Sequence, residues 1–451
     1  MPDNENTQMQ VLVVGGGPLA LLTALMLHHA GIPVSMTGER PPTNPPLNPE
    51  LMLVGGDDSL PPLFQLSLDQ WRALSTKLGL PPVFGSTPAQ DLATSLGRVE
   101  KLRTEAMLDA LGGEPVTFSE GAPAHAPGAL GAKNWAEAPM LLANTLTLLQ
   151  QAVTEAQIPR SYSNPVSLSV ASGPQVVLED GQTRSAKYIV FTSARALRKV
   201  LPPLGLALPL RPARGHVLML QTSQPHHLPL MLQRLNRGHL FMVPVGPDRV
   251  DVHYDAINDP AQSTFNTQHS QSLVTALQQH VAQLVPVLAG ASLVGISTAR
   301  HWLTPDFLPA IGPWPGLPGV LVGTGWGGRS TAFAAGAAAV LVEAITSEGS
   351  ITTNVQALAP NRFASGLWQV VKQPGSLTWQ EPAYEIDNSM LSPKPEYMQN
   401  VTMTQTPKPE YAQHVQQVGK KVTESAAHRP AVMQGRAKPK VTTAAVKGNP
   451  E

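Results

Sequence analysis

The chain has 451 residues, more than a single hydrophobic core usually fills, so we expect at least two packed domains. Its 31 basic and 31 acidic residues give a formal charge of zero, which argues against nucleic acid or an anionic membrane as the main partner. The absence of cysteine excludes disulfides, thiolate nucleophiles, cysteine-ligated zinc and any cofactor linked through a cysteine.

The N-terminus is polar and acidic and lacks the basic start and cleavage site of a secretory signal, so we expect a cytoplasmic location. Residues 11–32 form the most apolar stretch, long enough to imitate a membrane span. Three consecutive glycines and a proline interrupt this stretch. We therefore predict a strand, a turn and a helix there, and no membrane span.

A strand, a glycine turn, a helix and a second strand follow one another near the start of the chain. The apolar run at residues 11–14 is typical of a strand buried on both faces of a parallel sheet. After the glycines at 15–17, residues 18–30 predict a helix with proline in its first turn, and Gly31 ends it. Residues 34–37 supply the second strand. This βαβ unit is typical of the start of a nucleotide-binding domain.

The central region mixes helical and β-rich segments. Proline and glycine crowd residues 41–62, which predicts a loop, and residues 64–78 predict a helix. A further helix is predicted at 138–156, and short β-rich runs occur at 175–178, 217–221 and 249–254. Such a mixture suits a substrate domain inserted between parts of the nucleotide-binding domain.

A second strand, glycine turn and helix occur late in the chain. Residues 320–322 again have the pattern of a buried strand, and a glycine-rich turn follows at 323–328. An alanine-rich segment at 332–345 predicts the helix.

From residue 375 onward proline, lysine, glutamine, threonine and serine dominate, so this tail buries too little apolar surface to offset its ordering entropy. We predict that it is disordered. It contains a near-repeat, SPKPEYMQNV at 392–401 and TPKPEYAQHV at 406–415. Two readings stay open, namely two copies of a peptide that docks on a protein partner, and a solvated linker or tail.

The first glycine turn has the spacing G-x-G-x-x-A, which allows a tight turn and a close approach of a pyrophosphate to the helix N-terminus. The residues of this motif are Gly15, Gly16, Gly17, Pro18, Leu19 and Ala20. The acidic residue that normally binds the adenosine ribose is missing, because Gly38 occupies its position. Glu39 follows and takes this role if the strand end bulges by one residue; otherwise it is a surface glutamate beside Arg40.

The order of segments across residues 10–347 resembles the D-amino-acid oxidase and glycine oxidase family of FAD enzymes. The most specific similarity is the run LTPDFLPAIGPWPGLPGVLVGTGWGGRS at 303–330, a loop that leads into a strand and a glycine turn facing the flavin. The segments RPARG at 211–215 and PLFQLSLDQWRALSTKLGL at 62–80 are also similar to segments of that family.

The resemblance implies an α/β fold in which a Rossmann-type FAD-binding domain carries an inserted mixed α+β substrate domain, with the disordered C-terminal tail added. We expect the FAD-binding domain at residues 10–85, 141–205 and 299–374. The substrate domain is expected at 86–140 and 206–298, and the tail at 375–451.

The resemblance also implies FAD as the cofactor, with Gly15, Gly17 and Ala20 at the pyrophosphate and Val166 in the backbone segment near the adenine. The segment from Gly325 through Thr331 would approach the isoalloxazine ring, where unhindered N–H groups stabilise charge at the flavin O2. The residues implied there are Gly325, Gly327, Gly328, Arg329, Ser330 and Thr331. Arg329 either strengthens this effect or is an exposed arginine at a helix start.

Several positions depart from the family pattern around the cofactor and the substrate. Besides Gly38, Ala194 and Ser330 stand where the family commonly has glycine. The loop that covers the flavin, normally rich in serine, alanine and glycine, is the proline-rich NPPLNPELM at 44–52.

In amino-acid-oxidising members of the family, an arginine before the T-P-D motif binds the substrate carboxylate. A strict count places His301 at this position and Arg300 one residue earlier, where its side chain faces the other side of the strand. Arg300 and His301 are both candidates for the substrate site; a structural salt bridge and a packed histidine are the alternatives. His216 and His253 also fall on predicted strands, and nothing marks the histidines as metal ligands.

The implied activity is oxidation of the C–N bond of an amino acid or secondary amine by hydride transfer to flavin N5, with dioxygen or another electron acceptor. The altered motifs and the tail repeat favour an alternative, a flavoprotein-like subunit of a multi-protein complex with a degenerate substrate site, serving assembly or electron relay. An NAD(P)-dependent dehydrogenase, with Arg40 as a phosphate contact, is the third and weakest interpretation.

Overall fold

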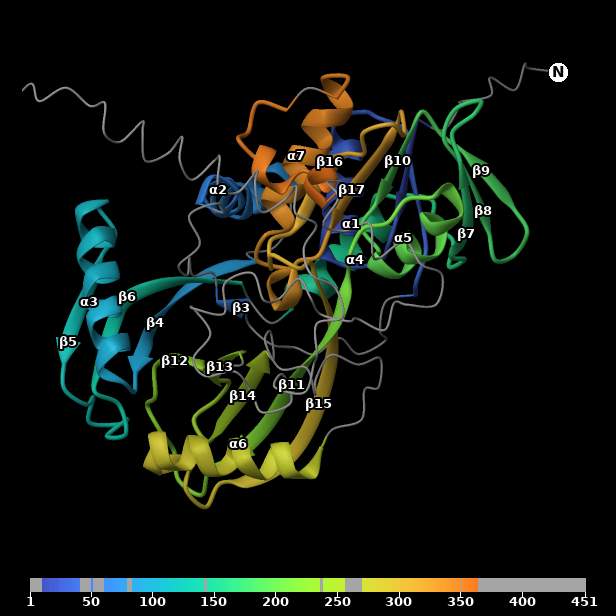
Figure 1. Cartoon of the computed structure of the whole chain (residues 1–451). Coiled ribbons are helices and arrows are strands. Elements are labelled where there is room, and N and C mark those ends of the chain that lie inside the picture. The colour runs from blue at the N-terminus through green and yellow to red at the C-terminus, as the bar shows by residue number, and fades with distance from the viewer. Residues whose placement is uncertain are drawn as a thin grey trace, which may run out of the picture. The chain divides into compact units, whose positions relative to one another are not determined.

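The computed structural model describes residues 10–40, 50–51, 61–78, 83–141, 144–235, 238–255, 270–349 and 351–363 (Figure 1). The tail from residue 375, with its PKPEY repeat, lies outside these residues, as does most of the proline-rich segment at 44–52. The described residues form two large sheets, a small third sheet and the helices that cover them.

The first sheet has the strand order β16-β17-β10-β1-β2. Its strands are β1 (Val11–Val14), β2 (Val34–Thr37), β10 (Tyr188–Phe191), β16 (Ala310–Pro313) and β17 (Val320–Thr324). The four strands from β17 to β2 are parallel, and β16 pairs antiparallel with β17. All four residues of β1 are buried, as expected for a parallel sheet covered on both faces.

The two faces of this sheet carry different layers, and β1 contributes alternate residues to each. Val11 and Val13 pack into a core with helices on one face, and Leu12 and Val14 pack into a core on the other. The helices of the first layer are α1 (Pro18–His29), α2 (Pro61–Leu78), α4 (Thr145–Glu155) and α7 (Ala334–Thr346). The second layer contains α5 (Ala194–Val200) and the three-stranded sheet of β7 (Pro165–Ser169), β8 (Gln175–Leu178) and β9 (Thr183–Ser185).

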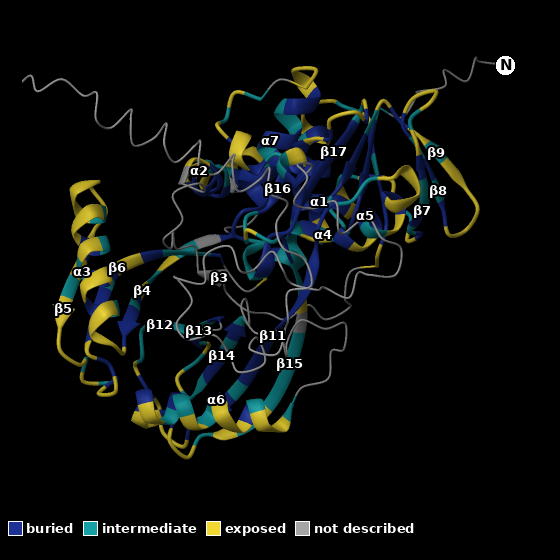
Figure 2. Cartoon of the chain, viewed as in Figure 1, coloured by how far each residue is buried: buried dark blue, intermediate teal, exposed yellow. Residues whose placement is uncertain are grey.

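The second sheet has the order β15-β11-β14-β13-β12-β4-β6-β3, and β5 pairs with β6. Its strands are β3 (Glu50–Leu51), β4 (Phe84–Ala93), β5 (Val116–Glu120), β6 (Gly131–Leu141), β11 (Arg211–Gln221), β12 (Leu230–Leu235), β13 (Gly238–Pro244), β14 (Arg249–Asp255) and β15 (Ser292–Leu303). Helix α6 (Gln271–Leu284) packs on one face of β11, β13 and β14, while its outer face is exposed (Figure 2). Helix α3 (Leu96–Leu111) packs near β4, β5 and β6.

The long strand β15 connects the second sheet to the late glycine turn. It pairs antiparallel with β11 along its length, and its last residue, Leu303, forms an isolated antiparallel bridge with Trp326. The remaining short helices are at Pro202–Leu204, Pro286–Leu288, Gly327–Arg329, Gln356–Leu358 and Pro360–Phe363. Among the described helices, none combines the length and apolar composition required to cross a bilayer.

The structure confirms the predicted strands at the start of the chain, the helix after each glycine turn and the α/β class. The helix predicted at 138–156 is wrong at its start, because residues 138–141 belong to β6 and the helix begins at Thr145. Leu141 pairs with Phe84 of β4, so pairing between strands overrides the local helical pattern. The boundaries of the expected domains stay predictions.

Helices α2 and α7 approach each other so closely that their backbones are in contact. The carbonyl oxygen of Ala332 accepts hydrogen bonds from Ser67 Oγ at 2.6 Å and from Trp71 Nε1 at 3.0 Å. Ser67 Oγ also accepts from the backbone N–H of Gly336 at 3.1 Å. A Cβ atom at Gly336 would lie 2.8 Å from the backbone nitrogen of Ser67 and 2.9 Å from the carbonyl oxygen of Leu63. Glycine at this position therefore allows the start of α7 to be fixed against α2.

We predict that Gly336→Ala lowers the free energy of unfolding by about 1–3 kcal/mol, because the new methyl group meets backbone atoms that cannot rotate away. Gly97→Ala is the matched control, since Gly97 lies in the first turn of α3 and nothing lies within 4 Å of its Cβ position. This control should leave stability unchanged or raise it by up to about 1 kcal/mol. Chemical denaturation of both variants measures the difference, and equal midpoints would contradict the backbone contact.

Candidate functional site

The first glycine turn lies at the carboxyl end of β1 and is packed against neighbouring backbone. Gly15 has φ +151° and its N–H donates to the carbonyl oxygen of Thr37, at the end of β2, at 2.8 Å. A Cβ atom at Gly15 would overlap Thr192 Oγ1, which follows β10. Any side chain here would therefore push the end of β1 away from the residue that follows β10.

Gly17 has the opposite environment, because it is exposed and nothing lies within 4 Å of its Cβ position. It is the N-cap residue of α1 and provides no side-chain hydrogen bond to the amides of the first helical turn. Those amides and the positive end of the helix dipole can face an anion directly. The open space above Gly17 has the character that a bound pyrophosphate requires. Leu19 and Ala20 of the motif are buried on the inner side of the helix.

The structure explains the glycine found where an acidic residue is usual. Gly38 has φ +128°, and a Cβ atom there would lie 3.1 Å from the backbone nitrogen of Gly15. Glu39 is next, and its Oε1 accepts a hydrogen bond from Arg195 Nη1 at 3.4 Å in an exposed ion pair. The Arg40 guanidinium lies 4.9 Å from the centre of the Tyr162 ring. Glu39 and Arg40 are therefore both at the end of β2, next to the first turn.

Val166 lies in β7 at an irregularity of the strand. Pro165 pairs with Leu178 and Ser167 pairs with Val177, so Val166 has no opposite residue on β8. A bulge of this kind leaves backbone groups out of the ladder and available to a ligand. The segment before it is tied to the end of β2, because Thr37 Oγ1 donates to the carbonyl oxygen of Ser163 at 2.7 Å. The predicted adenine segment is thus held beside the first glycine turn.

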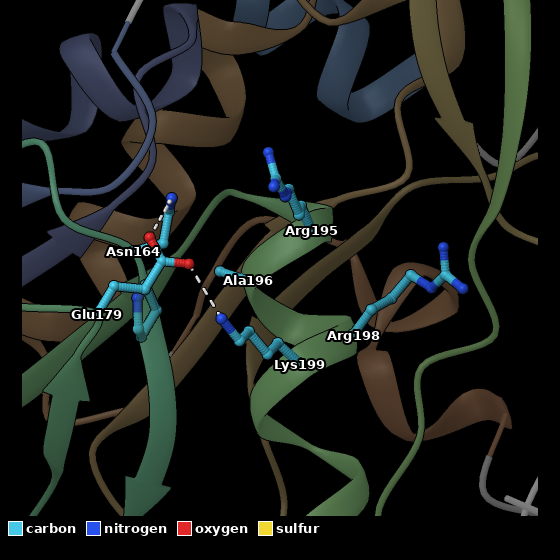
Figure 3. Close-up of a pocket in the computed structure, with 7 residues that line it drawn as sticks. Asn164, Glu179, Arg195, Ala196, Arg198 and Lys199 are labelled. Carbon is cyan, nitrogen blue, oxygen red and sulfur yellow. Dashed lines mark hydrogen bonds and ion pairs between the residues drawn. The ribbon is translucent and has the colours of Figure 1, made fainter. Parts of the chain in front are cut away.

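A charged hollow lies next to this segment, between α5 and the strands β7 and β8 (Figure 3). Glu179 accepts hydrogen bonds from Asn164 Nδ2 at 3.2 Å and from Lys199 Nζ at 3.0 Å. These bonds lower the pKa of Glu179, the Lys199 contact having the larger effect. Since its carboxylate already neutralises Lys199, and Arg195 is paired with Glu39, we assign no reaction to this hollow.

The second glycine turn follows β17 at the same edge of the first sheet. Gly325 has φ +82° and Gly327 has φ +60°, both in the left-handed region that favours glycine. A Cβ atom at Gly325 would lie 2.8 Å from Thr304 Cγ2. The two glycine segments are neighbours, because a Cβ atom at Gly323 would lie 2.7 Å from Leu19 Cδ2 at the start of α1.

The rest of the turn leads into α7 through aromatic contacts. The Arg329 guanidinium lies 5.6 Å from the centre of the Phe333 ring, and Trp326 stacks with the same ring at 6.1 Å. Ser330 is half-buried, and the carbonyl oxygen of Thr331 accepts from the backbone N–H of Ala334 at 3.1 Å.

One face of the second sheet meets this turn. Asp255, at the end of β14, is opposite Gly215 on β11 and His239 on β13. A Cβ atom at Gly328 would overlap the Asp255 carboxylate, so the end of β14 touches the glycine turn. His253 lies on the same face, two residues before Asp255, because side chains alternate along a strand.

His301 faces the same side as Asp255, whereas Arg300 faces the other side. His301 pairs with Ala213, and a Cβ atom at Gly215 would overlap its imidazole ring. Arg300 is exposed and pairs with Arg214, on the opposite face of the strands. Counting along the sequence thus predicted correctly that the side chains of Arg300 and His301 lie on opposite faces of β15.

Two of the histidines on this face, His239 and His253, are neutral near neutral pH. Burial lowers the pKa of His239 to about 4, although the Asp255 carboxylate acts in the opposite direction. Burial likewise lowers the pKa of His253 to about 4, with Asp251 and Asp255 opposing it. Nowhere in the described ranges do three or more histidine, aspartate or glutamate side chains form a group that could hold a metal ion.

Three buried polar atoms near the glycine turn have no hydrogen-bond partner among the described residues. They are Asp255 Oδ1, His253 Nε2 and Trp326 Nε1. Sequence reasoning missed His239 and Asp255, although the alternation in RVDVHYD at 249–255 places Asp251, His253 and Asp255 on one face. His216, also considered from sequence, lies on the opposite face, where it stacks with Tyr254.

These features fit an extended dinucleotide such as FAD. One end has the open helix N-terminus at Gly17 and the bulge at Val166, and the other has the glycine turn with buried polar atoms still to be satisfied. Both ends lie at the carboxyl edge of one parallel sheet, where such ligands bind in open α/β folds.

Comparisons with known proteins agree with this geometry. A glycine oxidase of Pseudomonas aeruginosa is 28% identical over 155 residues, which cover 33% of this chain and 39% of the relative. A tRNA 5-methylaminomethyl-2-thiouridine biosynthesis bifunctional protein of Hahella chejuensis is 29% identical over 201 residues, covering 41% of this chain and 30% of the relative. The matches thus span less than half the length of these two relatives.

A crystal structure of glycine oxidase from Geobacillus kaustophilus has the same fold, with a TM-score of 0.68 and 20% sequence identity. The likeness covers 78% of this chain and 98% of that structure. Residues 10–344 also match the family described as DAO, FAD dependent oxidoreductase. The match confirms the resemblance found in the sequence and the predicted cofactor: the chain belongs to the DAO family of FAD-dependent oxidoreductases.

Proposed function

We propose that the chain oxidises the C–N bond of a small amine or amino acid held between the second glycine turn and the face of β13, β14 and β15. The observation that carries this proposal is the contact between Gly328 and the carboxylate of Asp255. It brings the end of β14, a strand of the expected substrate domain, to the turn expected at the flavin ring. When bound, FAD supplies the acceptor for the hydride removed from the carbon beside nitrogen.

The cofactor would lie along the carboxyl edge of the first sheet. Gly15, Gly16 and Gly17 would receive the pyrophosphate, with Pro18, Leu19 and Ala20 forming the helix start behind it. Glu39, with Arg195, would lie at the ribose, and the Val166 backbone at the adenine. The ring end would be received by Gly325, Gly327, Gly328, Arg329, Ser330 and Thr331, whose backbone N–H groups can stabilise charge at the flavin carbonyl.

The chain's own side chains would orient the substrate. His239 and His253 stay uncharged near neutral pH, so they can line the site without repelling a cationic amine. His301 faces the site and is our candidate for a polar contact with the substrate. Arg300, the other candidate from sequence, lies on the opposite face of β15 and would act only indirectly.

The names of the relatives support an amine substrate, since one is a glycine oxidase. The alternative function, a subunit for assembly or electron relay, rests mainly on the tail repeat. That repeat lies outside the described residues, so a protein partner stays a prediction from sequence.

We predict that Gly17→Leu weakens FAD binding by at least about tenfold, because the side chain would fill the space open to the pyrophosphate. The matched control is Gly97→Leu, which adds the same side chain at another exposed helix start. Fluorescence titration of the flavin-free protein with FAD measures the affinities. If both variants bind FAD as tightly as the wild type, the pyrophosphate does not lie at this turn.

We expect the purified protein to be yellow and its flavin absorbance to be bleached without oxygen by at least one amine. A suitable panel contains glycine, N-methylglycine, proline and simple alkylamines. Each amino acid is paired with the 2-hydroxy acid of the same shape, which should leave the flavin oxidised. Bleaching by the hydroxy acids alone would reject C–N oxidation.

We further predict that His301→Gln raises the KM for the bleaching amine by about tenfold, since it disturbs a polar contact worth about 1.4 kcal/mol. Arg300→Gln is the control on the neighbouring residue and should change KM less than about twofold. Stopped-flow reduction of the flavin at several amine concentrations measures both values. The opposite ranking would assign the substrate contact to Arg300.

A further inference from the structure

Asp255 presents a carboxylate to the second glycine turn without a partner of opposite charge. Among the described residues it forms no ion pair, and its Oδ1 is inaccessible to solvent and accepts no hydrogen bond. Its other oxygen lies against Gly328. The nearby Asp251, on the same strand and face, is instead bound by Arg249 at 2.9 and 3.0 Å. The two carboxylates of β14 therefore differ in whether a guanidinium neutralises them.

The two histidines beside Asp255 do not supply a counter-charge. His239, directly opposite on β13, and His253, on the same strand, are held neutral by burial. The Arg329 guanidinium in the turn lies 5.6 Å from the centre of the Phe333 ring, and its positive charge helps to lower the pKa of His239. Asp255 is half-buried and its inaccessible Oδ1 lacks a hydrogen bond, so a cationic ligand at this position would gain both an ion pair and a hydrogen bond.

We propose that Asp255 binds the positively charged nitrogen of the substrate. The site would then prefer ligands with an ammonium group over ligands whose only charged group is a carboxylate. This inference rests on the proposed function, because it names the substrate class of the same site. The carboxylate touches the turn expected at the flavin ring, so a nitrogen bound to it would lie near the reacting end of the cofactor. His239 and His253, held neutral by burial, add no competing positive charge at this position.

Two probes of similar size and opposite charge test the proposal, namely n-butylamine and n-butyrate. Isothermal titration calorimetry on the flavin-loaded protein should show that wild type binds n-butylamine more tightly than n-butyrate. Asp255→Asn should weaken the binding of n-butylamine by about tenfold or more, the loss expected for a charge-assisted hydrogen bond. The same variant should bind n-butyrate as tightly as wild type does, or more tightly.

The control variant is Asp248→Asn, which removes the same charge just before β14, where Asp248 accepts from Gln221 Nε2 at 2.6 Å. It should leave both affinities within about twofold of wild type. A thermal melt establishes that each variant is folded, and Asp255→Ser replaces Asp255→Asn if the latter is not. Equal weakening of both probes, an unchanged amine affinity, or no preference for the amine in wild type would each overturn the proposal.

Flavin bleaching separates this inference from the proposed function. If amines bleach the wild-type flavin but Asp255→Asn binds n-butylamine normally, C–N oxidation stands and the role of Asp255 is rejected. If n-butylamine binding depends on Asp255 but no amine in the panel bleaches the flavin, the ammonium site stands and the proposed oxidation is rejected.

Discussion

The direct backbone contact between Gly15 and Gly38 sets the geometry of the candidate cofactor edge. With no side chain at either position, the ends of β1 and β2 lie close enough for the Gly15 N–H to bond to Thr37. The same close approach explains the glycine at residue 38, since a larger side chain there would press on the backbone of Gly15. Glu39 takes the next position, where it pairs with Arg195. Tight packing below the turn thus leaves the space above Gly17 open.

The second glycine turn is held from two sides. Behind it, the Ala332 carbonyl receives two side-chain donors from α2, which fixes where the turn ends and α7 begins. In front, Leu303 at the end of β15 bridges to Trp326, and Asp255 touches Gly328. Strands of the second sheet therefore reach the turn directly. A site built on such supported elements holds its groups more rigidly than one built on long loops.

The sequence predicted secondary-structure elements correctly where their pattern depends only on neighbouring residues. The apolar runs and glycines around residues 11–37 and 320–345 have periodicities that distant contacts do not change, and the structure confirms the elements they predict. The helix prediction for residues 138–141 was wrong because pairing with β4 decides their conformation. Asp255 and His239 were missed because their partnership depends on the register between β13 and β14, which single-strand patterns do not encode. The alternation of Arg300 and His301, in contrast, follows from counting back from the T-P-D motif.

The alternation in β15 also determines which side chain the strand presents to a ligand. Leu303 is anchored at the glycine turn, so losing one residue between Arg300 and Thr304 would bring a guanidinium to where an imidazole now lies. The scaffold would be kept, yet the polarity that the strand presents to a ligand would be reversed. A single-residue deletion in this strand would therefore change the side chain that faces the proposed site from an imidazole to a guanidinium.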